Sequence, residues 1–251
     1  MDLINKINLS RKTLKEFLKS EWDTSVISDY SNQEIEKIYR TKSYKNKEIS
    51  FGKATPFNLE LNHKLVPSHK LHVIYYNFPE LNSRLLKITK ACGYKMLDLY
   101  TKEIINPEDS IILILTDTIT ENIETAIEDI YKKGQEELLI NNLSDEIIDQ
   151  NEKLGEDKLR YEHFRNIHVF NLNTLTINIG QHILVPKHEC IRKMNEIEEI
   201  LTKTNTTRKQ LPIILRKDPM AKLLRLAPGD ICKITRISDK CGEYSYYRIC
   251  E

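Results

Sequence analysis

The chain has 251 residues, of which 30% are charged and 40% are hydrophobic, and its formal net charge is +1. Glycine and proline are sparse, with 7 and 8 residues, so the composition is that of a folded chain and excludes a disordered or collagen-like one. No apolar run approaches the length of a membrane span, and residues 1–9 lack the apolar segment of a signal peptide. We therefore expect an intracellular protein that uses no membrane and keeps its five cysteines as free thiols.

The charge is distributed unevenly along the chain. Residues 166–251 contain 14 Lys or Arg against 9 Asp or Glu, a net charge of +5, whereas residues 1–165 contain 24 against 28, a net charge of −4. A mildly basic C-terminal part suits an acidic protein surface or nucleic acid, and its charge is too small to choose between them.

The first predicted elements are two short helices. Ser10 is placed to cap a helix. The apolar stripe of that helix comprises Leu14, Phe17, Leu18 and Trp22. Ser31 and Glu34 form the capping-box pattern before a second helix. The two helices predict a helical hairpin, and the polar, lysine-rich residues 41–53 predict a loop after it.

The next elements alternate between strand and helix. Residues 71–76 and 111–115 are β-rich apolar runs, and the second run suits a strand buried on both faces. A helix is predicted from Pro79 to about Gly93, and another over residues 121–133. This order implies a small α/β layer with parallel pairing. No glycine-rich loop follows either strand, so a nucleotide site is not expected.

Residues 135–160 interrupt the regular pattern with eight acidic and three basic residues. Such a charge run is typical of an exposed, partly helical insertion, and a partner-binding segment is the alternative. We place this acidic insertion inside an N-terminal domain of residues 1–165, followed by a C-terminal domain of residues 166–251.

The C-terminal domain begins with β-rich sequence. Residues 167–170 predict a strand, and residues 174–179 alternate apolar and polar side chains as a half-buried strand does. Residues 189–203 predict an amphipathic helix, in which Glu199 and Lys203 form an i,i+4 pair. The stripe of this helix comprises Cys190, Met194, Ile197 and Leu201.

The remaining C-terminal elements are short. Residues 210–215 are extended, and Asp218 with Pro219 starts a short helix as N-cap and first helical residue. Residues 231–237 and 244–250 predict two strands joined by a glycine-containing hairpin loop.

The chemistry-bearing side chains do not form a recognisable catalytic or metal site. His182, His188 and Cys190 invite a zinc interpretation, but they lack the paired short spacings of a four-ligand site. A Cys190–His188 pair lacks a third group that would orient the base. No carboxylate pattern for holding catalytic magnesium ions is present. We therefore expect no catalytic residue, no metal and no cofactor.

Several short motifs stand in a fixed order over the last 70 residues. Residues 182–188 read His-Ile-Leu-Val-Pro-Lys-His. The motifs that follow are Leu211-Pro212, Asp218-Pro219, Gly229-Asp230, Arg236, Gly242 and Tyr247-Arg248. In these motifs and their order the chain resembles the fifth subunit of eukaryotic RNA polymerases, whose C-terminal domain matches a small subunit of the archaeal enzyme. The opening helical pair and the α/β layer resemble the eukaryotic jaw domain in outline.

The resemblance implies a fold and a role. The fold is α/β (α+β), with a helical hairpin and a truncated Rossmann-like jaw domain followed by a small mixed-sheet domain. The role is non-catalytic: the C-terminal domain docks on the largest polymerase subunit near the sixth subunit. The N-terminal domain forms part of the lower jaw around downstream duplex DNA, where weak, non-specific contacts would go to phosphates.

The candidate residues fall into two groups under this interpretation. The expected subunit-interface residues are Val185, Pro186, His188, Pro212, Asp218, Arg236, Tyr247 and Arg248. The expected structural residues are His182, Leu211, Pro219, Gly229, Asp230 and Gly242. Asp218 also has the pattern of a helix cap, which competes with an interface role.

The chain departs from the sequence motifs of the family in two further places. Residues 116–120 lack the Thr-Pro-Ser sequence of the family, and residues 222–224 replace its aromatic pair with Lys-Leu-Leu. With the heavy use of Ile, Asn and Lys, these departures suggest a copy encoded by a large cytoplasmic DNA virus, or by a divergent protist. The expected location is the virion and viral factory, or otherwise the nucleus. A free-standing nucleic-acid-binding regulator of transcription is the alternative function, and a small enzyme on the α/β layer is a third.

Overall fold

The computed structural model describes residues 2–41, 49, 51–81, 83, 87–238, 240 and 242–251. The chain forms two compact units, one from Met1–Gln150 with Phe164–Ile177 and the other from Asn151–His163 with Asn178–Glu251. The chain thus enters the second unit, returns to the first, and enters the second again. This division differs from the single boundary after residue 165 that the sequence suggested.

The first unit is built on a four-stranded sheet in the order β1-β2-β3-β4. The strands are β1 (Leu59–Asn62), β2 (Lys70–Tyr76), β3 (Ser110–Leu115) and β4 (Ile167–Asn171). Strand β1 is antiparallel to β2, whereas β2, β3 and β4 run parallel. Every residue of β3 is buried, as its unbroken apolar run predicts. The three parallel strands confirm the predicted α/β layer.

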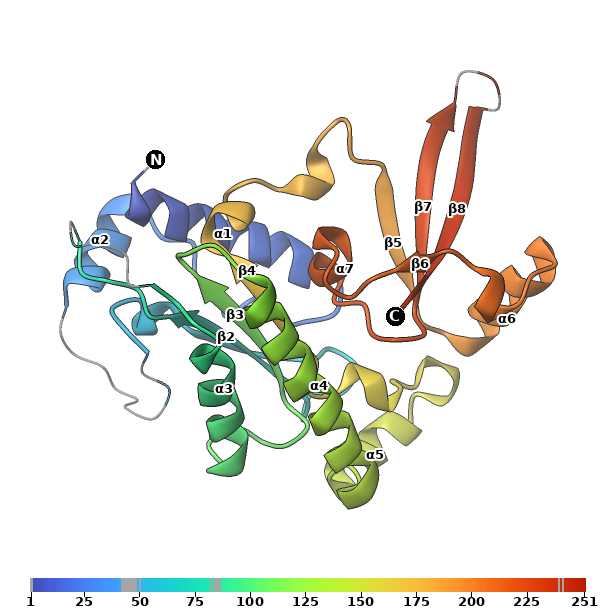
Figure 1. Ribbon diagram of the computed structural model, residues 1–251, viewed down its shortest axis with the longest axis horizontal. Helices are drawn as coiled ribbons and strands as arrows, with labels where there is room; N and C mark the ends of the chain where they lie inside the picture. The colour runs from blue at the N-terminus through green and yellow to red at the C-terminus, as the bar shows by residue number, and fades with distance from the viewer. Residues whose placement is uncertain are drawn as a thin grey trace. The chain divides into compact units, whose positions relative to one another are not determined.

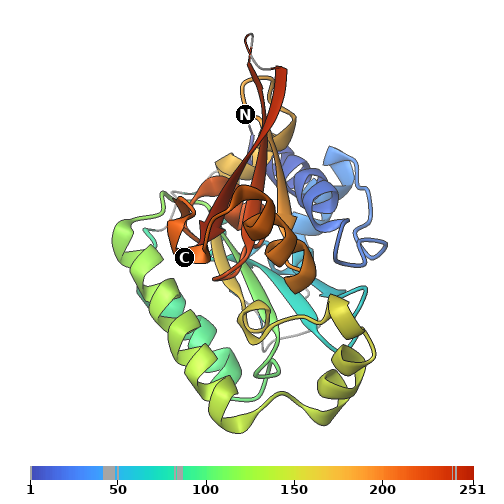
Figure 2. The same ribbon diagram turned by 90° about the vertical axis from the view of Figure 1, so that its right-hand side faces the viewer.

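Helices cover both faces of this sheet, as Figures 1 and 2 show. Helices α3 (Ala91–Thr101) and α4 (Glu121–Asn141) pack on one face, and α1 (Leu3–Leu18) with α2 (Asn32–Arg40) lies over the other. The core beneath α3 and α4 includes the predicted inward residues of α4, which are Ile123, Ile127 and Ile130.

The N-terminal helix starts earlier than its sequence suggested. Helix α1 begins at Leu3, so Ser10 is a buried residue in mid-helix rather than a cap. The Ser10 hydroxyl contacts the Ile7 carbonyl at 2.8 Å and the Tyr75 hydroxyl at 3.0 Å. In contrast, the capping box of Ser31 and Glu34 forms as predicted at the start of α2.

The predicted helix from Pro79 to Gly93 is wrong. Helix α3 begins at Ala91, so Gly93 lies in its first turn, and the residues described between 79 and 89 are not helical. A Cβ atom on Gly93 would lie 3.1 Å from Ile130, so glycine lets α3 approach α4 closely. Most of the predicted loop at residues 41–53 lies outside the described residues.

The acidic stretch of residues 135–160 is partly helical and mostly exposed, as predicted, and it also contributes core residues. Helix α4 continues to Asn141, and α5 spans Asp145–Glu152. Its apolar side chains include three that are buried, namely Leu138, Leu143 and Ile147. The part of this stretch that follows residue 150 belongs to the second unit.

The predicted strand over residues 174–179 is also wrong. A 3-10 helix occupies Leu172–Thr176, because the Asn171 side chain accepts a hydrogen bond from the Asn173 amide and caps it. Leu175 is buried while Ile177 is exposed. The other 3-10 helices of the described chain are Thr55–Phe57, Gly155–Asp157, Tyr161–His163, Ile179–Gln181 and Arg208–Gln210.

The second unit contains a mixed four-stranded sheet in the order β5-β7-β8-β6. The strands are β5 (Lys187–Ile191), β6 (Ile213–Ile214), β7 (Ile231–Ser238) and β8 (Gly242–Cys250). Strands β7 and β8 form the predicted hairpin, while β6 pairs with β8 in parallel. Beyond the last β5 pairing, at Thr235, the hairpin continues as two strands alone (Figures 1 and 2).

Two helices cover opposite faces of the second sheet. Helix α6 (Met194–Thr204) packs on the face that carries Ile231 and Ile249. Helix α7 (Pro219–Leu223) packs on the face that carries Cys232 and Ile234. Helix α6 starts five residues later than predicted, because residues 187–191 form the edge strand β5. The α+β class is confirmed, and none of the described helices is long and apolar enough to span a membrane.

Candidate functional site

A buried carboxylate lies at the centre of the second unit. Asp230 is fully buried at the start of β7. One carboxylate oxygen, Oδ1, accepts hydrogen bonds from Arg160 at 2.5 Å and from His163 Nε2 at 2.8 Å. The other, Oδ2, accepts from Arg192 Nε at 3.2 Å and from the Ala227 amide at 2.9 Å. We call the four side chains of Arg160, His163, Arg192 and Asp230 the Asp230 cluster.

The protonation states of the Asp230 cluster follow from its hydrogen bonds. Nδ1 of His163 accepts from the Arg160 amide at 3.1 Å, so the proton of the neutral ring sits on Nε2 and faces Asp230. Burial lowers the pKa of His163 and keeps the ring neutral. Burial acts to raise the pKa of Asp230, but the electrostatic interaction and hydrogen bond with His163, together with the charges of Arg192 and Arg160, outweigh burial and hold that pKa well below its usual range. Asp230 is therefore an ionised carboxylate between two guanidinium groups.

The glycine before Asp230 makes this arrangement possible. Gly229 has a φ of +86°, and a Cβ atom there would collide with a guanidinium nitrogen of Arg160. The Gly-Asp motif therefore has two functions: glycine leaves room for Arg160, and aspartate neutralises it. An ion pair between Lys193 and Asp157, at 2.7 Å, adds a second link between residues 151–163 and the rest of the unit.

The sequence motif identifies Gly229 and Asp230 but not Arg160 and His163, with which they interact. Arg160 and His163 lie far from Asp230 in sequence, at separations of 70 and 67 residues, so no short motif joins them. The only available signal was a basic residue and a histidine at the end of an acidic stretch.

A groove beside the hairpin collects three of the predicted interface residues. It has a volume of about 950 Å³, and its walls come from residues 183–187, from Glu189, and from β7 and β8. Val185, Pro186 and Arg236 line this hairpin groove. Its rim is strongly apolar and exposed, since Ile183, Leu184 and Ile237 are 94%, 82% and 87% exposed.

The charged groups of the hairpin groove pair with one another. Lys187 lies 2.5 Å from Glu189, which also lies 3.5 Å from Lys233. The hydrogen bond from Lys187 lowers the pKa of Glu189. Arg236 lies over the Tyr246 ring at 5.2 Å. With Lys187, Glu189 and Lys233 paired and Arg236 stacked, the groove offers a partner both apolar surface and polar groups, among them Glu243.

The other predicted interface residues lie elsewhere in the second unit. His188 contacts the Pro186 carbonyl through Nδ1 at 2.7 Å, and Tyr247 packs against the core under α6. The Pro212 carbonyl accepts from the Ile249 amide, and Arg248 donates to the Ile213 carbonyl at 3.2 Å. Asp218 is the N-cap of α7, where its side chain accepts from two backbone amides.

The residues predicted to be structural lie in different surroundings. Pro219 is the first residue of α7, Leu211 is buried, and Gly242 opens β8 with a φ of +69°. His182 is exposed and accepts from the Leu184 amide at 3.2 Å.

His182, His188 and Cys190, the residues that suggested a zinc site, make separate local contacts. Cys190 Sγ lies 3.8 Å from Asp230, away from the contacts that His182 and His188 make. Burial raises the pKa of the Cys232 thiol to about 11. Among the residues that the structure describes, no group of three His, Cys, Asp or Glu side chains could hold a metal ion. Cys241 lies outside those residues.

Comparison with known proteins identifies relatives of the second unit. Residues 177–250 match the family model described as "RNA polymerase Rpb5, C-terminal domain". The chain is 42% identical over 73 residues to DNA-directed RNA polymerase subunit Rpo5 of Methanococcus maripaludis, covering 92% of that protein and 29% of this chain. It is 49% identical over 72 residues to the Rpo5 subunit of Nitrosopumilus maritimus, covering 86% of that protein and 29% of this chain.

A eukaryotic relative matches over a similar length. The subunit rpabc1 of DNA-directed RNA polymerases I, II, and III of Dictyostelium discoideum is 41% identical over 81 residues, which are 41% of that protein and 32% of this chain. All fourteen candidate residues lie within the segment that the family model matches, whereas Arg160 and His163 precede it.

Proposed function

This chain belongs to the Rpb5/Rpo5 family of DNA-directed RNA polymerase subunits, and from that premise we propose that it is a non-catalytic structural subunit of a multisubunit RNA polymerase. The observation that carries the proposal is the match to whole archaeal Rpo5 subunits, 92% of one of which aligns with this chain. A subunit that consists almost entirely of this domain must assemble through it, so the second unit is the part that joins the enzyme.

The hairpin groove is the surface that we propose to dock on the largest polymerase subunit. Ile183, Leu184 and Ile237 together expose apolar surface on one side of the second unit. Grouped apolar side chains with paired charges beside them are typical of a protein interface, whereas a nucleic-acid surface would present unpaired basic residues. Arg236 and Tyr244 supply the residue types that often dominate binding energy at such surfaces.

The first unit is proposed to form the jaw-like part of the subunit, near a sixth-subunit homologue and downstream DNA. The support is its order of elements, a helical pair followed by a parallel α/β layer, which resembles the eukaryotic jaw domain. Contacts to duplex DNA would be weak and independent of sequence, and they would decrease with rising salt. A viral source, and with it a location in virions and viral factories rather than the nucleus, stays a prediction.

A paired substitution in the hairpin groove tests the docking surface. The variant Leu184→Asp with Ile237→Asp places two charges on the apolar rim, and both side chains are so exposed that the fold should tolerate the change. We expect the tagged double variant to lose at least about 90% of the co-purifying polymerase, because each buried charge would cost several kcal/mol at an interface.

A matched control comes from the first unit. Leu139 is 65% exposed on α4, and Leu139→Asp makes the same chemical change away from the groove. The control should retain polymerase as the unmodified chain does. Equal retention by the double variant would show that the hairpin groove does not dock on the enzyme.

A further inference from the structure

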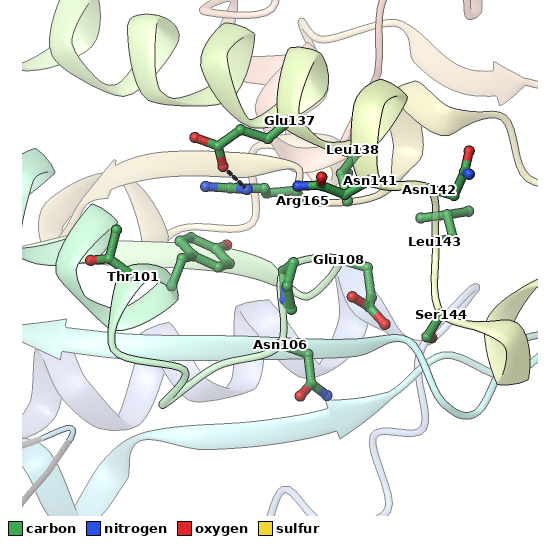
Figure 3. A pocket seen from close by; sticks show the side chains of 12 residues that line it. Thr101, Asn106, Glu108, Glu137, Leu138, Asn141, Asn142, Leu143, Ser144 and Arg165 are labelled. Carbon is green, nitrogen blue, oxygen red and sulfur yellow. Dashed lines mark hydrogen bonds and ion pairs between the residues drawn. The ribbon is translucent and has the colours of Figure 1, made fainter.

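A second pocket lies wholly within the first unit, outside the segment that matches the known polymerase domain. It has a volume of about 480 Å³ and lies where the C-terminal ends of α3 and α4 come together (Figure 3). Its walls are Tyr100 and Thr101, residues 106–108, residues 137–138 and 141–144, and Arg165. We call it the α4-end pocket.

The positive charge in the α4-end pocket is already neutralised. Arg165 Nη1 lies 2.6 Å from Glu137, and the Arg165 side chain is only 3% exposed. Its guanidinium carbon lies 4.4 Å from the centre of the Tyr100 ring. A Cβ atom on Gly134 would lie 2.5 Å from Arg165 Nε, so the sequence of α4 leaves room for this side chain. One carboxylate and one ring therefore hold Arg165, while its buried Nε has no hydrogen-bond partner.

Glu108 supplies a second carboxylate to the pocket. Its residue is 7% exposed, and its backbone carbonyl accepts from the Arg165 amide at 2.8 Å. Among the residues that the structure describes, none forms a hydrogen bond or an ion pair with its carboxylate. Figure 3 shows this carboxylate between Asn106 and Ser144, with no interaction drawn to it. Neither oxygen of this carboxylate is among the buried side-chain atoms that lack a partner, so water reaches the carboxylate from the pocket, and a cation there can take the place of that water.

The groups around Glu108 also favour a positively charged ligand in the pocket. Helices α3 and α4 end at Thr101 and Asn141, and the carbonyl end of a helix attracts cations. The side-chain oxygens of Asn106, Asn141 and Ser144 add hydrogen-bond acceptors at the walls. Glu108, Glu137 and Arg165 together give the pocket a net charge of −1.

We propose that the α4-end pocket binds an organic cation with a primary ammonium group, which donates hydrogen bonds to Glu108 and to the surrounding amide and hydroxyl oxygens. An ammonium group has three donors and no acceptor, so it can donate to the Glu108 carboxylate and to the amide and hydroxyl oxygens at the walls at the same time. Such a group comes either from a free polyamine or from a lysine side chain of a partner protein. The proposal does not depend on how the second unit joins the polymerase.

The test uses the full chain, labelled with nitrogen-15, and follows backbone amide resonances around the pocket. The probes are spermidine, for a free polyamine, and N-acetyl-lysine methylamide, for a lysine side chain. Sodium chloride and magnesium chloride at the same ionic strength serve as reference salts. We expect saturable shifts of the amides of residues 141–144 with the ammonium probes, and none with either salt.

Two charge-matched variants decide whether Glu108 is the receptor. Glu108→Gln removes the unpaired carboxylate with little change in shape, and Glu136→Gln removes the same charge from an exposed position on α4. Loss of one charge-assisted hydrogen bond should weaken binding by about tenfold or more in Glu108→Gln, and by less than about twofold in Glu136→Gln. If Glu108→Gln is poorly folded, Ser144→Phe, which adds a ring at the exposed edge of the pocket, should abolish the same shifts.

Tighter binding of spermidine than of the lysine amide, by about tenfold or more, would identify a free polyamine, and similar affinities would identify a lysine side chain. The proposal is overturned if the shifts do not saturate, if magnesium reproduces them, or if Glu108→Gln and Glu136→Gln bind equally.

Discussion

Replacing Asp230 by asparagine should selectively unfold the second unit. The substitution keeps the size of the side chain but removes the charge that faces Arg160, Arg192 and His163. An amide also turns one of the two acceptor atoms into a donor, which opposes the donors already aimed at it. The two arginine side chains are only 19% and 16% exposed, so water can replace the lost carboxylate only in part.

The expected loss of stability is large for a unit of this size. Removing one partner from a buried ion pair costs about 3–5 kcal/mol. For a unit of this length, 1 kcal/mol shifts the unfolding midpoint by about 4–8 °C, so we expect a decrease of more than about 10 °C. The control is Glu243→Gln, which removes the same charge from an exposed position on β8 and should change the midpoint by less than about 2 °C.

Local reporters distinguish the two units in this experiment. Hydrogen exchange of peptides from β7 and β8 reports on the second unit, and Trp22, the one tryptophan of the chain, reports on the first by its fluorescence. Asp230→Asn should speed exchange in β7 and β8 and leave the Trp22 transition in place. A loss below about 1 kcal/mol would refute the view that Asp230 neutralises two largely shielded arginines.

Two further predictions concern the same cluster. Gly229→Ala should lower the free energy of unfolding in urea by at least about 2 kcal/mol, because its backbone conformation is strained for alanine and the new Cβ meets Arg160. Gly242→Ala, with a similar φ but open space around the Cβ, should lower it by only about 1 kcal/mol. Equal losses of unfolding free energy would contradict a steric role for Gly229. Because burial lowers the pKa of His163 from its usual 6.5, the unfolded chain takes up a proton below pH 6.5 that the folded chain does not, so the second unit should lose stability as the pH falls below that value. His163→Gln keeps a donor to Asp230 and should flatten this dependence in urea midpoints measured from about pH 7.5 to about pH 5; an unchanged slope would contradict the assignment of a neutral ring.

Elements set by neighbouring residues were predictable from the sequence. The capping box at Ser31, the Asp218 cap with Pro219, and the β7–β8 hairpin all depend on contacts within a few positions, and all form as predicted. The parallel layer was predictable because β3 is apolar on both faces, which only a covered sheet allows.

Elements set by distant contacts were not predictable. Cys190 fits the apolar stripe of a helix in the sequence. In the structure it belongs to strand β5, whose backbone pairs with β7 so that Cys190 lies opposite Cys232. The alternation of residues 174–179 suits a strand, but the Asn171 side chain caps a 3-10 helix there instead. The proposed docking surface, the hairpin groove, contains Val185, Pro186 and Arg236 from the predicted set, and it also contains the exposed Ile183, Leu184 and Ile237, which that set lacked. Exposure depends on which faces the sheet and α6 leave uncovered, and one strand's sequence does not contain that information.

Affinity purification of the tagged chain, followed by mass spectrometry of the co-purifying proteins, tests the central claim most directly. We expect the largest subunit of a DNA-directed RNA polymerase among the most abundant partners, in near-equal amounts with the tagged chain and stable to salt that removes nucleic acid. Recovery of the chain alone, or only with nucleic acid that leaves at raised salt, would contradict the account and favour a free-standing nucleic-acid-binding regulator.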